Sequence, residues 1–120
     1  MSTHPNVILL VSLNPDGLTR KTLREILADA KVATDEQDAE IKISGQDYSY
    51  AVMESDYLED WQISGYEGDI VFFRLITYGY GEKVKWADLE KEKSDLEQWA
   101  KSICEKFHCR YDIFVTANYW

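Results

Sequence analysis

The 120-residue chain contains only two cysteines and no long hydrophobic run. Cys104 and Cys109 are too few and too close in sequence to form the disulfide framework of a small secreted domain. The longest apolar runs, residues 7–11 and 70–73, are far shorter than the roughly 20 residues that cross a bilayer. The first nineteen residues lack Lys and Arg, whereas a secretory signal begins with positive charge. We therefore expect a cytoplasmic protein with free thiols and no membrane segment.

Motifs for catalysis and for metal binding are also lacking. The sequence has no Gly-rich phosphate loop and no nucleophile elbow. Cys104, His108 and Cys109 lie close together, but zinc sites usually take four ligands, and the other histidine is His4, near the N-terminus. A suggestive pair of carboxylates carries little information in a chain with 22 acidic residues. The sequence predicts a protein that is not an enzyme and that has no metal or cofactor.

Basic residues are nearly absent from residues 34–69, which we call the acidic segment. It holds eleven acidic residues against one base, Lys42, so it carries a formal charge of −10 while the whole chain carries −9. Concentrating charge in this way costs self-repulsion that an even distribution would avoid. Five large aromatic residues are interleaved with the acids: Tyr48, Tyr50, Tyr57, Trp61 and Tyr66. Such a surface would repel nucleic acid and attract a cationic partner.

An apolar content of 45% and this chain length predict one globular domain over residues 1–120. Continuous apolar runs rich in β-branched residues predict strands that are buried on both faces at residues 6–13 and 70–78. A last strand is predicted at residues 111–119.

The first half of the acidic segment fits two geometries. Alternation over residues 40–53 matches one long strand with a bulge at Gly45, which we favour, or a hairpin that turns at Gly45. Residues 54–69 show no clean period and are predicted to form a long surface loop.

Helical periodicity appears twice. The first segment, residues 19–31, places four apolar residues on one face: Leu23, Ile26, Leu27 and Ala30. The second follows residue 86 and places five on one face: Leu89, Leu96, Trp99, Ile103 and Phe107. Glu92 and Lys93 interrupt this second face, and Ser94 with Glu97 matches a capping box. We therefore expect a short turn and then a main helix over residues 95–107.

The order of elements, strand, helix, strand, strand, helix, strand, predicts an α+β fold. It corresponds to a ferredoxin-like β-α-β-β-α-β sandwich, in which an antiparallel sheet carries two helices on one face. The alternative is a five-stranded or barrel-like sheet, which would follow if Gly45 is a hairpin turn. Within this fold, Phe72, Leu96 and Ile103 are expected in the core.

The aromatic residues of the acidic segment favour a binding surface. Tyr57, Trp61 and Tyr66 lie in the predicted loop, where core packing does not require large rings. Tight protein interfaces commonly place aromatic anchors inside a charged rim. A solvated face that only keeps the protein soluble is the alternative interpretation. The predicted partner-binding residues are Tyr48, Tyr50, Glu54, Asp56, Tyr57, Glu59, Asp60, Trp61, Tyr66, Glu67 and Asp69.

A small, acidic, cysteine-poor chain with such a segment resembles the bacterial immunity proteins that neutralise cationic nuclease toxins in contact-dependent growth inhibition and related systems. The resemblance rests on residues 35–69 and on the size of the chain. It implies a protein that covers the toxin's active site or a nearby surface, with Glu54, Asp56, Glu59 and Asp60 facing Lys and Arg of the toxin.

Two other classes of function remain open. A ferredoxin-like domain can hold a small-molecule or regulatory site, with Tyr78, Tyr80 and the neighbouring glycines at its rim. A nucleic-acid mimic would space its carboxylates like phosphates and bind a protein that handles DNA or RNA. Identifying the protein that co-purifies with the chain from its native host would separate the three.

Overall fold

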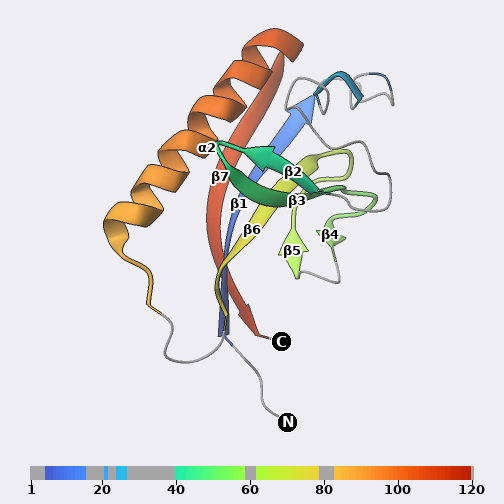
Figure 1. Cartoon of the computed structure of the whole chain (residues 1–120). Helices are drawn as coiled ribbons and strands as arrows, with labels where there is room; N and C mark the ends of the chain where they lie inside the picture. Colours follow the sequence, from blue (N-terminus) through green and yellow to red (C-terminus); the bar gives the residue numbers. More distant parts are fainter. Residues whose placement is uncertain are drawn as a thin grey trace.

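A five-stranded antiparallel sheet and one long helix form the framework of the molecule (Figure 1). The structure, a computed structural model, describes residues 5–15, 21, 24–26, 40–58, 62–78 and 83–119. Its elements are β1 (Pro5–Pro15), β2 (Glu40–Ile43), β3 (Gln46–Val52), β4 (Tyr57–Leu58), β5 (Ile63–Ser64), β6 (Ile70–Tyr78), α2 (Trp86–Phe107) and β7 (Cys109–Tyr119). Lys21 and residues 24–26 are also helical, and the rest of the first predicted helix lies outside the described residues.

The central strand is β1, which is buried on both faces. The large sheet has the order β2-β3-β6-β1-β7, so β1 is paired with β6 on one side and with β7 on the other. Leu9, Val11 and Leu13 point to one face, while Ile8 and Leu10 point to the other, and all five are at most 4% exposed. Because both faces are covered, every residue in the middle of the strand must be apolar. The predicted buried strand is confirmed.

One face of the sheet is covered by helices. Leu96, Ala100 and Ile103 of α2 are buried against the side of β1 that carries Leu9, and Ile26 of the first helical segment belongs to the same core. The Phe72 ring on β6 meets the Trp99 ring edge to face, with centroids 4.9 Å apart. The prediction that Phe72, Leu96 and Ile103 form part of the core is confirmed.

The opposite face of the sheet is covered by the small hairpin β4–β5. Ile63 and Met53 are buried there together with Val71 and Phe73 of β6, and Leu58 packs against them. The prediction of a long surface loop over residues 54–69 was therefore wrong, because part of this segment pairs as a short ladder and supplies core residues. Strands of two residues are too short to show the alternation that identifies a strand.

A hairpin, and not a bulged strand, connects β2 to β3. Ile43 pairs with Gln46, and the two residues between them, Ser44 and Gly45, both have positive φ, at 51° and 84°. Positive φ at both central positions is the geometry of the two-residue turn that best fits twisted strands. The favoured bulge was wrong, and the sheet has five strands. The fold is α+β with an antiparallel sheet and two helices, while the ferredoxin-like order of four strands is not confirmed.

The second helix is continuous from Trp86 to Phe107. The expected break before residue 95 was wrong, and Ser94 is an interior residue of α2, not its cap. Glu92 interrupts the apolar face because its carboxylate binds Arg74 of the sheet, so the polar position belongs to the helix interface. In the described part of the chain, no helix is sufficiently long and apolar to cross a membrane.

The burial of Leu96 gives a direct test of how α2 packs. Leu96→Ala is expected to lower the free energy of unfolding by about 2–5 kcal/mol, because it removes buried methyl groups and leaves a cavity. Gln98→Ala, at an exposed position of the same helix, serves as the control and should change it by less than about 0.5 kcal/mol. Urea titration measures both. Equal effects of the two substitutions would show that α2 packs through another face.

Candidate functional site

The structure divides the predicted partner-binding residues between the two faces of the sheet. Tyr48 and Tyr50 of β3 point toward α2, where Tyr48 is only 1% exposed and Tyr50 packs against Phe72. Five others are exposed around the β4–β5 hairpin: Glu54, Asp56, Tyr57, Tyr66 and Glu67. Asp69 belongs to the same region but is 3% exposed. Glu59, Asp60 and Trp61 lie outside the described residues.

Backbone hydrogen bonds bring the two ends of the hairpin region together. The Met53 N–H donates to the Asp69 carbonyl and the Gly68 N–H donates to the Met53 carbonyl, both at 2.8 Å. The Gly65 N–H donates to the Asp56 carbonyl at 3.0 Å. Gly68 has a φ of 90°, which a residue with a side chain rarely adopts. These bonds hold residues 53–56 against residues 65–69.

The Asp69 carboxylate anchors this region to β1. Its Oδ2 accepts a hydrogen bond from Ser12 Oγ at 2.9 Å, and its Oδ1 accepts one from Asn14 Nδ2 at 2.5 Å. The Tyr66 N–H donates to Oδ2 at 3.3 Å. A carboxylate that is buried must be hydrogen-bonded to offset the loss of water. Asp69 therefore positions Tyr66, and its burial leaves it little surface to offer directly to a protein partner.

Beside Asp69 the surface is hollowed, and exposed aromatic residues stand at this hollow. We call it the Asp69 hollow; its lining residues are Ser12, Asp56, Ser64, Gly65, Tyr66, Asp69, Asp112 and Phe114. Tyr66 is 77% exposed and Phe114 is 50% exposed. Arg110 borders it on the β7 side. Two exposed carboxylates, Asp56 and Asp112, and two aromatic rings give this concave surface the chemistry to hold a cationic side chain.

Asp112 and Phe114 were missed in the sequence because they lie outside the acidic segment. They reach the hollow through the register of β7 on β1, where Asp112 lies opposite Ser12 and Phe114 opposite Leu10. Alternation in β7 does put Arg110, Asp112 and Phe114 on one face. The sequence offered no signal that this face lies next to Asp69.

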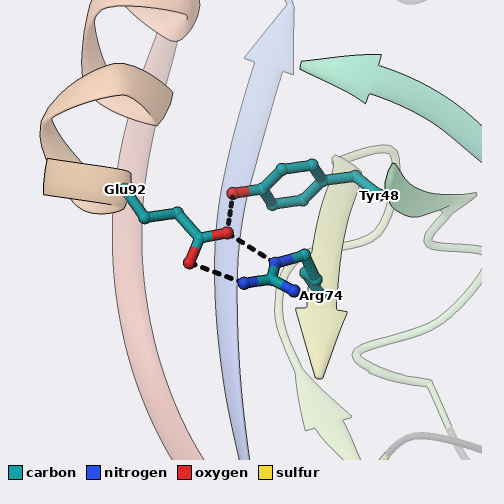
Figure 2. Close-up of polar contacts among 3 residues, drawn as sticks. All are labelled: Tyr48, Arg74 and Glu92. Atoms are coloured by element: carbon teal, nitrogen blue, oxygen red, sulfur yellow. Dashed lines mark hydrogen bonds and ion pairs between the residues drawn. The ribbon is translucent and has the colours of Figure 1, made fainter. Parts of the chain in front are cut away.

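A second polar cluster joins α2 to the sheet on the other face (Figure 2). Arg74 of β6 binds Glu92 of α2 with two parallel hydrogen bonds, Nε to Oε1 at 2.5 Å and Nη2 to Oε2 at 2.9 Å. The Tyr48 hydroxyl donates to Glu92 Oε1 at 3.1 Å. The Arg74 and Glu92 side chains are 31% and 14% exposed. Three elements, β3, β6 and α2, therefore meet at one carboxylate.

The protonation of this cluster is fixed near neutral pH. Burial raises the pKa of the Tyr48 phenol far above its usual range, and the negative charge of Glu92 raises it further. The hydrogen bond with Glu92 raises the pKa of the Arg74 guanidinium, which is already high. A phenol that stays neutral and a guanidinium that stays charged suit a structural contact.

Comparisons with known proteins add no relative. Neither the models of protein families, nor the curated proteins, nor the solved structures contain a significant match to this chain. Among the residues that the structure describes, no group of three or more His, Cys, Asp or Glu side chains is placed to hold a metal ion. Of the rim proposed for a small-molecule site, Tyr80 and the glycines beside it lie outside those residues.

The ion pair can be tested with a double-mutant cycle. Arg74→Met and Glu92→Leu should each lower the free energy of unfolding by about 1.5–3 kcal/mol, because each leaves a partly buried charge without its partner. The double variant should lose clearly less than the sum, since neither charge then remains. Glu90→Leu, on the exposed side of the same turn, is the control. Additive losses in urea titrations would contradict the coupling.

The phenol of Tyr48 predicts a dependence of stability on alkaline pH. Its pKa is higher in the folded protein than in the unfolded chain, so the unfolded chain loses this proton first. The resulting stabilisation is fully present below about pH 10, the usual tyrosine pKa, and is lost as the pH rises further. Urea titrations across this range should show a shallower decline for Tyr48→Phe. An identical decline in both proteins would contradict this assignment.

Proposed function

We propose that this chain is an acidic protein-binding module that holds a cationic protein at the Asp69 hollow. The observation that carries the proposal is the placement of two exposed aromatic rings, Tyr66 and Phe114, at a concave surface with the exposed carboxylates of Asp56 and Asp112. An aromatic ring that is exposed to water lacks the favourable free energy of burial, and a bound partner that covers the ring supplies it. The carboxylates select for positive charge.

The charge of the chain supports the same proposal through the rate of encounter. The acidic segment carries a formal charge of −10 while the whole chain carries −9, and Glu54, Asp56 and Glu67 are exposed within it. A concentrated negative field attracts a cationic protein over several ångströms and raises its association rate. Glu59, Asp60 and Trp61 stay predicted members of this surface.

An immunity protein of a toxin–immunity system is the class of protein that these features suit best. A nuclease toxin must bind nucleic acid and so presents positive charge around its active site. A small acidic protein that covers this surface would exclude the nucleic acid. The bacterial cytoplasm, where such a toxin acts, is the proposed location, and contact-dependent growth inhibition is the proposed type of system.

We also propose that the fold is a ferredoxin-like sandwich with an added edge strand. The neighbours β3, β6, β1 and β7 are all antiparallel, and the crossovers into β2 and β7 pass through helical segments on one face. The hairpin then adds β2 beside β3.

The first test identifies the partner. It is captured by purifying the chain from its native host, and the expected partner is a basic protein.

The second test separates the exposed acids, which are expected to speed association, from the aromatic rings, which are expected to slow dissociation. Reversing Glu54, Asp56 and Glu67 to Lys should slow association and flatten its dependence on salt, because the attracting field is removed. Tyr66→Ala or Phe114→Ala should speed dissociation, with a loss of 2 kcal/mol or more, roughly thirtyfold in affinity.

The matched control is Glu90→Lys, an exposed acid on α2. Glu92 is unsuitable as a control because it binds Arg74. If Glu90→Lys weakens binding as much as the reversals do, the interface lies elsewhere on the molecule. If no basic protein is captured, the acidic surface serves only to keep the protein in solution.

A further inference from the structure

The two cysteines meet where α2 ends and β7 begins. Cys104 lies in the last turn of α2 and Cys109 is the first residue of β7. Between them, His108 adopts the left-handed conformation with a φ of 55°, and its N–H donates to the Cys104 carbonyl. This turn reverses the chain direction within a few residues. It brings the two side chains together although the sequence spacing alone does not require it.

The sulfur atoms of this pair are in close contact. Cys104 Sγ and Cys109 Sγ are 2.6 Å apart while both are free thiols. A disulfide bond is about 2.04 Å long, so the two sulfur atoms lie within reach of a bond. The turn at His108 therefore holds the two thiols of the reduced chain next to each other.

The pair is also accessible to a small reagent. Both cysteines are half-buried and line a surface hollow together with Lys101, Glu105, Arg110, Tyr111 and Asp112. Lys101 and Arg110 are balanced there by Glu105 and Asp112, so the side chains of the hollow carry no net formal charge. A small disulfide such as oxidised glutathione therefore meets no strong repulsion when it approaches the sulfur atoms.

We propose that Cys104 and Cys109 form an oxidation site that reacts with a small disulfide such as oxidised glutathione and closes into an intramolecular disulfide. Cys109 Sγ attacks one sulfur of the oxidant, which forms a mixed disulfide and releases one glutathione thiolate. Cys104 Sγ then attacks Cys109 Sγ, which forms the protein disulfide and releases the second glutathione. The two thiol protons pass to the two leaving thiolates, so the protein loses two electrons and the oxidant gains them.

The order of attack follows from the surroundings of the two thiols. Burial raises the pKa of the Cys104 thiol, and its hydrogen bond with Cys109 adds to this effect. A thiol attacks as its thiolate, so Cys104 is a poor first nucleophile. It needs only to reach a sulfur atom with which it is already in contact. Oxidation would link the last turn of α2 covalently to the start of β7.

The test compares the folded chain with the same chain unfolded in urea. Each is equilibrated in glutathione buffers of increasing oxidised fraction, remaining thiols are alkylated, and intact masses are measured. The folded chain should pass from two alkylated thiols to none, with the loss of two hydrogen atoms and no lasting glutathione adduct. Because the fold holds the sulfur atoms together, its equilibrium constant for closure should exceed that of the unfolded chain at least about tenfold, which is about 30 mV in potential.

Cys104→Ser and Cys109→Ser are the matched controls. Each retains one thiol, so each should accumulate a glutathione adduct that the wild-type chain resolves, and Cys109→Ser should do so more slowly because the remaining Cys104 is the poorer nucleophile. The proposal fails if the folded wild-type chain accumulates such adducts on both thiols, or if it closes no more readily than the unfolded chain. Neither outcome depends on partner binding, so the test is independent of the proposed function.

Discussion

Burial of β1 on both of its faces is the constraint on which the rest of the molecule depends. A sheet with one wet face needs one covering layer, whereas Ile8 and Leu10 on one side and Leu9 and Val11 on the other need two. The helices supply one layer and the β4–β5 hairpin supplies the other. The acidic segment therefore also contributes to the hydrophobic core, because Ile63 and Met53 lie within it.

The elements that were predicted well are those with a continuous or strictly periodic apolar pattern. β1 and β6 are long, central and buried on both faces, so each appears in the sequence as a continuous apolar run. The face of α2 that holds Leu96 and Ile103 followed from helical spacing. The break expected near Glu92 was wrong because pattern reasoning treats a charge as solvent-facing, and here it is paired with Arg74, a residue distant in sequence. The sequence around Ser44 and Gly45 fits both a bulged strand and a hairpin. The pairing of Ile43 with Gln46 distinguishes them, and sequence alone does not show this pairing.

The candidate site was predicted in part for a related reason. Local composition located the exposed acids and Tyr66, since exposure of a charged loop needs no knowledge of the fold. It did not show that Asp69 is buried and hydrogen-bonded to Ser12 and Asn14, or that Phe114 lines the same hollow as Tyr66. Both facts depend on strand neighbours that are more than forty residues apart in sequence, and charge patterning cannot report such contacts.

The pairing of β1 with β7 has a consequence for how the chain folds during synthesis. Pro5 lies opposite Tyr119, and Pro15 lies opposite Cys109, so the central strand pairs with a strand that is made long after it. Its other neighbour, β6, also follows it by more than fifty residues. Until β6 has been made, the five buried apolar residues of β1 have no partner strand, and contacts between residues this distant in sequence form slowly. The nascent chain therefore exposes the apolar residues of β1 until these partner strands have been made, and such exposed surface is prone to aggregation.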